Sequence, residues 1–255
     1  IFVDECGSPT KMTGAQVVPI KTEDGKLSPD LIKPYLQGFG DEHRSQPGVI
    51  SISETTELGT IYTPAEIKEI VNLAHQYGLY VHMDGSRLSN AAASLGVSLR
   101  SLTADCGIDV LSFGGTKNGL MMGECVIVFN SNYYESARYI RKQSAQLGSK
   151  MRFISCQFTS YLTDDLWLKN AQHANDMAKL LYSKLVDFPQ VRFCQKVESN
   201  QLFLIMPRPL IDYLHQNYGS FYVDERTNTI RLVTSFDTTI EDVETFIQCV
   251  HEFYK

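Results

Sequence analysis

Closely spaced cysteines are the first feature that the sequence lacks. Its 255 residues contain six cysteines, and no two of them form a C-x-x-C motif, because even Cys106 and Cys125 stand far apart. This spacing disfavours a zinc ribbon or a thioredoxin-type redox site, and the low cysteine density disfavours a disulfide scaffold. We therefore expect free, mostly buried thiols, a cytoplasmic location and no metal site.

Long apolar runs and basic runs are also missing. No stretch approaches the roughly 18 apolar residues that cross a bilayer, and the formal net charge is −6. We therefore expect neither a membrane nor a nucleic acid as the main partner. The first residues include Asp4 and Glu5 instead of the basic start of a secretory signal. Because the sequence begins at Ile1 and not at methionine, we expect a processed or truncated chain.

The first half of the sequence contains alternating strand and helix patterns. Apolar runs predict four strands, at residues 48–53, 79–83, 110–113 and 125–129. Between the first two, Thr63 and Glu66 form a capping box that opens a helix ending near Gly78. Strand–helix alternation with nearly continuous apolar strands is typical of a mostly parallel sheet covered by helices. The predicted fold class is therefore α/β.

The second half has a different pattern. Residues 133–186 are predicted to be helical, and short strands are predicted at 191–194, 202–205 and 230–233, before a last helix over 239–254. We place a domain boundary near Thr163. The expected domains are a large one over 1–163 and a small α/β one over 164–255.

Two ionisable residues follow neighbouring strands of the predicted sheet. Asp84 follows the strand 79–83, and Lys117 lies in the glycine-rich segment GGTKNG after the strand 110–113. Ligands of open parallel sheets bind at the carboxyl ends of the strands. Pyridoxal phosphate (PLP) needs a lysine amine for its aldehyde and an acid opposite its ring nitrogen. The pair therefore suggests a PLP site.

Simpler interpretations of these residues remain open at this point. Asp84 could belong only to a turn and helix cap, and Lys117 could be a solvated surface charge. A phosphate-binding P-loop is rejected, because the order G-x-x-x-x-G-K-[ST] is not met. His82 is interpreted as a structural histidine whose ring points to the face of the strand opposite Asp84.

Longer segments extend the pattern around both residues. Asp84 lies in HMDGSRLSNAAASLGVSL, and Lys117 lies in DVLSFGGTKNGLMMGECVIVF. Four more segments accompany them: VDECGSPTKMTG, SETTELGTIYTPAEI, RKQSAQLGSKMRF and IRLVTSFDTTIEDV. Together, and in this order, they resemble the threonine aldolase family, within the aspartate-aminotransferase-like (fold type I) PLP enzymes. The resemblance covers essentially the whole chain.

The resemblance implies roles for four residues at the cofactor. Lys117 would be the Schiff-base lysine, and Asp84 would pair with the pyridine nitrogen. Arg87 would reach the ring oxygen of the cofactor or the carboxylate of the substrate. Thr116, beside the lysine, would also line the cofactor site.

The resemblance also implies how the substrate is bound. Arg231 would bind its α-carboxylate as a bidentate partner. Arg152 matches a basic position near the cofactor phosphate, contributed by a neighbouring subunit, and is assigned to substrate binding. The alternative is that Arg152 belongs only to the solvated face of a basic helix. The implied partners are a small amino acid and further copies of the chain, in a homodimer or homotetramer with shared active sites.

Two departures from the family pattern stand out. Many relatives have a histidine where this sequence has Glu57, so that Glu57, a bound water or a residue outside the chain would be the base for the substrate hydroxyl. Relatives also carry a further segment before VDECG, which holds a turn for the cofactor phosphate and a histidine that stacks on the ring. We therefore expect this chain alone to bind PLP weakly or not at all.

The expected reaction is retro-aldol cleavage of L-threonine or L-allo-threonine to glycine and an aldehyde. Two alternatives remain. One is another PLP-dependent lyase reaction on the same fold, such as β-elimination, and the other is a non-catalytic fragment or degenerate subunit that acts only through assembly.

Overall fold

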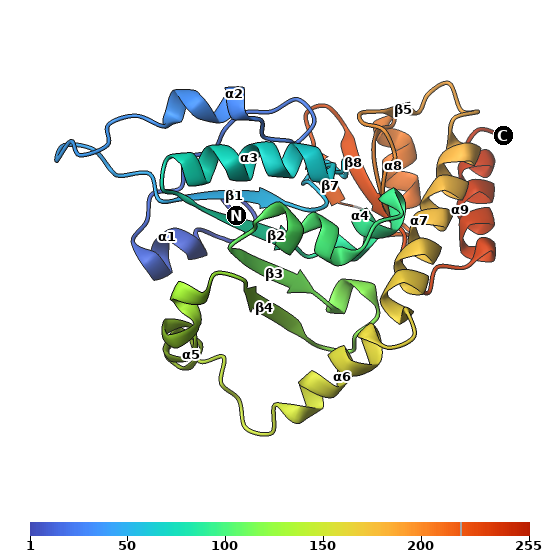
Figure 1. Ribbon diagram of the computed structural model, residues 1–255. Coiled ribbons are helices and arrows are strands. Elements are labelled where there is room, and N and C mark those ends of the chain that lie inside the picture. Colours follow the sequence, from blue (N-terminus) through green and yellow to red (C-terminus); the bar gives the residue numbers. More distant parts are fainter. Residues whose placement is uncertain (220) are drawn as a thin grey trace.

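The computed structural model describes residues 1–219 and 221–255, and in this range the strands form two four-stranded sheets with helices packed against them (Figure 1). The long helix α7 (Leu166–Leu185) contacts elements of both halves of the molecule. Within the described range, none of the helices has the length and apolar character required to cross a bilayer. The α/β fold class is confirmed.

The first sheet has the strand order β1 (Val49–Ser53), β2 (Tyr80–Gly85), β3 (Val110–Gly114) and β4 (Glu124–Val128). The first three strands are parallel, and β4 runs antiparallel to β3. The prediction of a mostly parallel sheet is thus confirmed, although β2 is longer than expected. Asp84 therefore belongs to the strand and does not follow it.

One face of this sheet is buried beneath helices. Ile50, Ile52, Val81 and Met83 alternate along β1 and β2 and point into the core. Helices α3 (Pro64–Gln76) and α4 (Leu88–Leu95) supply further buried residues to that core, with a short helix α2 (Pro29–Ile32) and the 3-10 turn η1 (Lys33–Tyr35) beside them (Figure 1). The capping box at the start of α3 is present, as the sequence predicts.

The other face of the first sheet is more polar. Nδ1 of His82 lies 2.9 Å from Ser51 Oγ, and its Nε2 lies 3.0 Å from Ser112 Oγ. Burial lowers the pKa of the His82 imidazole. The expectation that His82 and Asp84 point to opposite faces is wrong, because residues two apart on a strand share a face.

Short helical turns and three helices connect the two sheets. The helical prediction over 133–186 is confirmed, with breaks at 144–151 and 163–165. The remaining elements of the first half are α1 (Ser8–Thr13), η2 (Leu99–Leu102), η3 (Ala104–Cys106), η4 (Thr116–Asn118), η5 (Ser131–Tyr133), α5 (Tyr134–Gln143) and α6 (Arg152–Leu162).

The second sheet is antiparallel, with the order β5 (Arg192–Phe193), β6 (Gln201–Ile205), β8 (Thr229–Val233) and β7 (Phe221–Asp224). Helices α7, α8 (Arg208–Leu214) and α9 (Ile240–Phe253) contribute to its core. The sequence predicted β5, β6, β8 and α9, but it did not predict β7 or α8.

The two halves are joined by buried hydrogen bonds from α7. Asn175 Nδ2 donates to Asn90 O (2.9 Å), and Asn90 Nδ2 donates to Asn175 Oδ1 (3.1 Å). At the preceding residue of the helix, Thr234 Oγ1 donates to Ala174 O (2.7 Å). We retain the division near Thr163, between α6 and α7, as a proposal, with α7 forming the contact between the two parts.

Candidate active site

The turn that carries Asp84 and Arg87 is fixed by the end of β1. Glu54 N donates to Asp84 O (2.7 Å), and Arg87 N donates to Glu54 O (3.3 Å). Within the turn, Ser86 N donates to Asp84 Oδ1 (3.0 Å). These bonds orient both side chains at the carboxyl edge of the sheet, where ligands of such sheets bind.

The loop that carries Lys117 is held by the strand that follows it. Glu124 accepts hydrogen bonds from Gly115 N (Oε2, 3.2 Å) and Thr116 N (Oε1, 3.3 Å). The hydroxyl of Thr116 donates to Gly123 O (3.2 Å) and accepts from Gly123 N (3.1 Å). The side chain of Thr116 therefore shapes the loop. Lys117 itself is exposed and forms no hydrogen bond or ion pair with any described residue.

The Asp84 turn and the Lys117 loop touch each other. A Cβ built on Gly114 would lie 2.4 Å from Ser86 O and 2.6 Å from Ser86 Cα. Only glycine permits this approach, because the opposing atoms are backbone. The structure thus brings together the two segments that the sequence singled out, on the adjacent strands β2 and β3.

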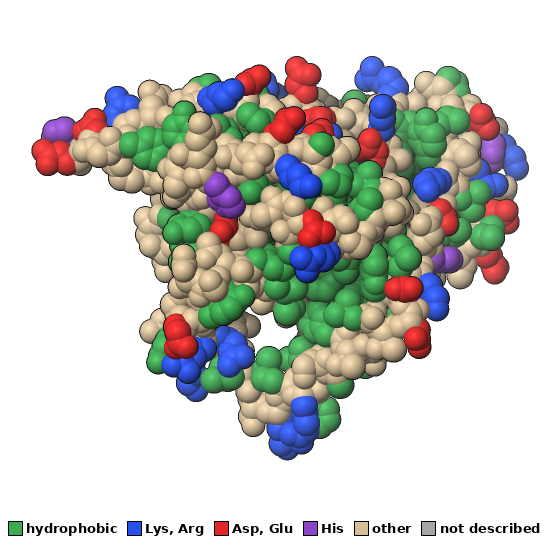
Figure 2. Space-filling view, viewed as in Figure 1, with side chains coloured by type: hydrophobic (Ala, Val, Ile, Leu, Met, Phe, Trp, Pro, Cys, Tyr) green, Lys and Arg blue, Asp and Glu red, His purple; other side chains and the backbone are tan. Residues whose placement is uncertain are grey.

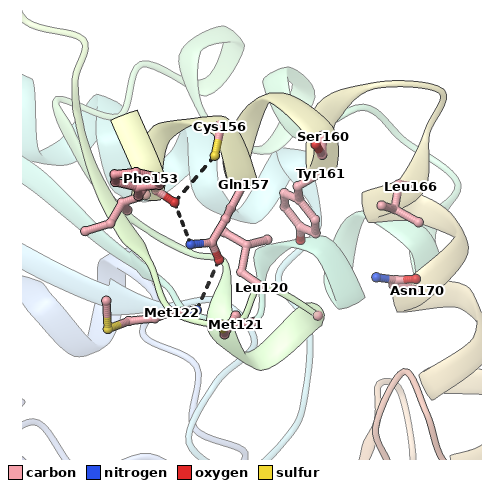
Figure 3. Close-up of a pocket in the computed structure, with 12 residues that line it drawn as sticks. Leu120, Met121, Met122, Phe153, Cys156, Gln157, Ser160, Tyr161, Leu166 and Asn170 are labelled. Atoms are coloured by element: carbon pink, nitrogen blue, oxygen red, sulfur yellow. Dashed lines mark hydrogen bonds between the residues drawn. The ribbon is translucent and has the colours of Figure 1, made fainter. Parts of the chain in front are cut away.

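Asn118, the residue after Lys117, points into the protein. Its Nδ2 donates to Tyr161 OH (2.6 Å) and to Trp167 O (2.9 Å), and Asn170 Nδ2 donates to Asn118 O (2.9 Å). Tyr161 and Asn170 come from α6 and α7 and face the same hollow in Figure 3. The backbone beside Lys117 is therefore fixed from two helices.

That hollow is apolar and is not the candidate site itself. It has a volume of about 610 Å³ and is lined mainly by the 119–122 segment, α6 and the start of α7 (Figure 3). Asp84, Arg87 and Lys117 are not among its lining residues.

Two arginines lie near each other at the site: Arg87, at the start of α4, and Arg231, on β8 of the second sheet. Burial and the neighbouring Arg231 guanidinium lower the pKa of Arg87 to about 10, while Glu57 and Asp84 oppose this shift. Arg87 therefore stays charged at neutral pH. Its Nε is buried and has no hydrogen-bond partner among the described residues. A pair of cations held close together favours an anionic ligand.

Glu57 belongs to a turn that connects the two halves. It is exposed, and Ser53 Oγ donates to its Oε1 (3.3 Å). The turn is fixed to the second half by Gln201 Nε2, which donates to Thr55 Oγ1 (2.9 Å), and by Ser199 Oγ, which donates to Gly59 O (3.1 Å). Glu57 thus lies close enough to Arg87 for its negative charge to raise the pKa of that guanidinium.

Arg152 is not brought into this group. It is the first residue of α6, at the end of the helix away from Tyr161, and it is exposed. Its guanidinium carbon lies 5.0 Å from the ring centroid of Phe153.

These residues fit PLP. Lys117 offers an amine without a competing partner among the described residues, and the glycines at its base let the loop pack closely against the Asp84 turn. Asp84 supplies a carboxylate on the adjacent strand. The buried Nε of Arg87 is a donor that still needs an acceptor.

Some residues that build the site were not predicted. Glu54 and Tyr161 act through long-range hydrogen bonds, and Glu124 bonds back to the loop before its strand; a single sequence carries no signal for such bonds. Asn118 could have been suspected, since a buried amide beside the lysine would need partners.

Comparisons with known proteins agree with this geometry. The family model described as "Beta-eliminating lyase" matches residues 1–207. The low specificity L-threonine aldolase of Pseudomonas aeruginosa is 41% identical over 244 residues, which cover 95% of this chain and 70% of that protein.

Solved structures show the same relationship. A threonine aldolase structure from Leishmania major superposes with a TM-score of 0.90 at 30% identity, and the match covers 99% of this chain and 74% of that one. A putative L-allo-threonine aldolase structure from Listeria monocytogenes, at 15% identity and a TM-score of 0.73, shares the fold. The chain belongs to the beta-eliminating lyase family of PLP-dependent enzymes, among its threonine aldolases.

Proposed function

We propose that this protein is a PLP-dependent carbon–carbon lyase that cleaves L-threonine, L-allo-threonine and related β-hydroxy-α-amino acids to glycine and an aldehyde. The observation that carries the proposal is the contact between the Asp84 turn and the Lys117 loop at Gly114 and Ser86. That contact supports the proposal, because it brings the Lys117 loop after β3 against the Asp84 turn at the end of β2, near Arg87 and Arg231.

Four residues hold the cofactor in this proposal. Lys117 would bind its aldehyde carbon, and the Asp84 carboxylate would keep a proton on its ring nitrogen. Arg87 donates from its unpartnered Nε to the ring oxygen or to the substrate carboxylate, and Thr116 fixes the loop beneath the lysine. When bound, the cofactor supplies an electron sink for the pair released from the broken bond.

Three residues act on the substrate. Arg231 binds the α-carboxylate in a bidentate manner and thereby orients the Cα–Cβ bond for cleavage. Arg87 lies close enough to share that negative charge. Glu57 takes the proton from the β-hydroxyl, so that the oxygen–carbon double bond of the aldehyde forms as the Cα–Cβ bond breaks.

The proposal includes an assembly and a location. The chain acts as a homodimer or homotetramer in the cytoplasm, and Arg152 reaches the active site of a neighbouring copy. Its exposure on α6 supports this role, because its guanidinium lies over the neighbouring Phe153 ring and forms no ion pair with a described residue.

Borohydride reduction of the PLP-loaded protein, followed by peptide mapping, tests the central assignment. The pyridoxyl group is expected on Lys117 and should disappear in Lys117→Arg, whereas Lys169→Arg, at an exposed lysine of α7, should keep it. Absence of the group from Lys117 in the unmodified protein would refute the assignment and favour a non-catalytic subunit.

A second candidate reaction is β-elimination, which the description of the matching family model favours. A product assay separates the two reactions. Glycine and acetaldehyde from L-threonine support aldol cleavage, whereas pyruvate and ammonia from a serine- or cysteine-type substrate, without glycine formation, support elimination.

A further inference from the structure

A buried chain of hydrogen bonds runs between the two halves of the candidate site. Asn118 Nδ2 lies 2.6 Å from Tyr161 OH, and Tyr161 OH lies 2.6 Å from Ser89 Oγ. The three side chains belong to η4, α6 and α4, and their residues are 3%, 1% and 2% exposed. Water therefore cannot substitute for any of these partners without opening the core.

Each end of the chain lies next to residues of the site. Asn118 follows Lys117 directly, and Ser89 lies in the first turn of α4, two residues after Arg87. Tyr161 comes from a third element and contributes no atom to the group of Asp84, Arg87 and Lys117. It thus connects the two segments by a route other than the pairing of β2 with β3.

The direction of one of these hydrogen bonds follows from the chemistry of the groups. An amide nitrogen can only donate, so the oxygen of Tyr161 accepts from Asn118. The same oxygen also shares a hydrogen bond with Ser89 Oγ, in which either hydroxyl can be the donor. Burial raises the pKa of the Tyr161 phenol, although Ser89 and Asn118 pull it down, and the phenol therefore keeps its proton. Displacement of either end would leave a buried polar group unpaired, which is costly.

The ring of Tyr161 is held in place independently of its hydroxyl. It packs against Phe113 (6.1 Å between centroids) and edge-on against Phe158 (6.5 Å). Asn118 is also fixed from α7, through Trp167 O and Asn170 Nδ2. Packing therefore holds the Tyr161 ring in one place, and its hydroxyl is a fixed hydrogen-bond partner for both Asn118 and Ser89.

We propose that Tyr161 is a positioning residue, which sets the placement of Lys117 relative to Asp84 and Arg87 through Asn118 and Ser89. The proposal rests on the function proposed for Lys117. Misplacement of a reacting group by about 1 Å can lower a rate about 100-fold, so a small relaxation of this chain has a measurable effect.

The test compares Tyr161→Phe, Ser89→Ala and the double variant with Tyr182→Phe, a matched control on α7 whose residue is 40% exposed. The substituted Phe keeps the ring packing and removes only the hydroxyl. We expect kcat to fall about 10-fold or more in both single variants. The double variant should show no additional loss, because both substitutions interrupt the same chain of hydrogen bonds. We also expect the pH midpoint of the yellow absorbance of the bound cofactor to shift in these variants and to stay unchanged in Tyr182→Phe.

Two results would overturn the proposal: both single variants within about 2-fold of wild type with unchanged absorbance midpoints, or losses that multiply in the double variant. If Tyr161→Phe does not fold, Ser89→Ala alone decides by the same readouts. Failure of the proposed function is recognised separately, because borohydride then places no pyridoxyl group on Lys117 of the unmodified protein.

Discussion

Gly114 lies against the backbone of Ser86 so closely that a Cβ on Gly114 would stand 2.4 Å from the carbonyl oxygen of Ser86. The first residue belongs to β3 and leads into the Lys117 loop, and the second lies between Asp84 and Arg87. The close approach of these two backbones therefore brings together the segments of Asp84, Arg87 and Lys117, which we propose hold the cofactor.

Gly114→Ala is expected to separate the two segments. The methyl group would meet backbone atoms that cannot rotate away, and such overpacking costs about 1–3 kcal/mol. Denaturant unfolding should show this loss, and borohydride trapping should show less pyridoxyl group on Lys117. Gly48→Ala is the matched control, because a Cβ on Gly48 meets nothing within 4 Å. Equal behaviour of the two variants would contradict the close approach.

Asp84→Asn is expected to keep the cofactor and lose turnover. The amide oxygen can still accept from Ser86 N, so the turn is preserved. It carries no charge to hold a proton on the ring nitrogen, and loss of such electrostatic stabilisation lowers kcat by about 100-fold or more. Steady-state kinetics and the absorbance of the bound cofactor measure the two effects. Asp187→Asn, at an exposed position after α7, should behave as wild type.

Glu57→Gln tests the base for the substrate hydroxyl. Glutamine can still accept from Ser53 Oγ, so the turn should keep its shape. General base catalysis contributes about 100- to 10,000-fold, and kcat for L-threonine should fall within that range. The cofactor absorbance and the trapping at Lys117 should not change. An unaltered kcat would remove Glu57 from the mechanism.

The buried carboxyl of Glu54 should make the stability of the folded protein depend on pH. Burial raises the pKa of its carboxyl well above the ordinary 4.5, and the hydrogen bond from Tyr62 N only partly opposes the shift. Above pH 4.5 the unfolded chain loses this proton while the folded protein keeps it. The folded state then binds more protons, so the free energy of unfolding falls as pH rises.

Glu54→Gln removes this titration. As pH is raised from 4.5 towards neutrality, the free energy of unfolding should therefore fall less in the variant than in wild type, so that the difference (variant minus wild type) increases. Urea unfolding at several pH values measures the difference. Glu69→Gln, at an exposed position of α3, is the control, and its free energy of unfolding should change with pH as that of wild type does. A constant difference between Glu54→Gln and wild type across this range would show that Glu54 is ionised in the folded protein.

Local patterns predicted much of this fold because they act over a few residues. The Thr63–Glu66 capping box, the apolar runs of the first sheet and the adjacency of the strands bearing Asp84 and Lys117 all follow from short spacings. Tyr161 and Glu54 could not be predicted in this way. Their partners are long-range, and a glutamate or tyrosine in a helix or strand end usually faces solvent. Arg231 was singled out only through the family resemblance.

The arrangement of α7 has a consequence for the range of substrates. Asn175 on α7 bonds α4 just beyond Arg87, and Ala174 beside it bonds Thr234, which follows the strand of Arg231. One helical turn of α7 thus connects the segment that follows Arg87 to the segment that follows Arg231. Substitutions at small buried positions of α7, far from the reacting atoms, should retune the width available to the carboxylate and side chain of the amino acid. Directed evolution of substrate scope would therefore do well to begin at this helix.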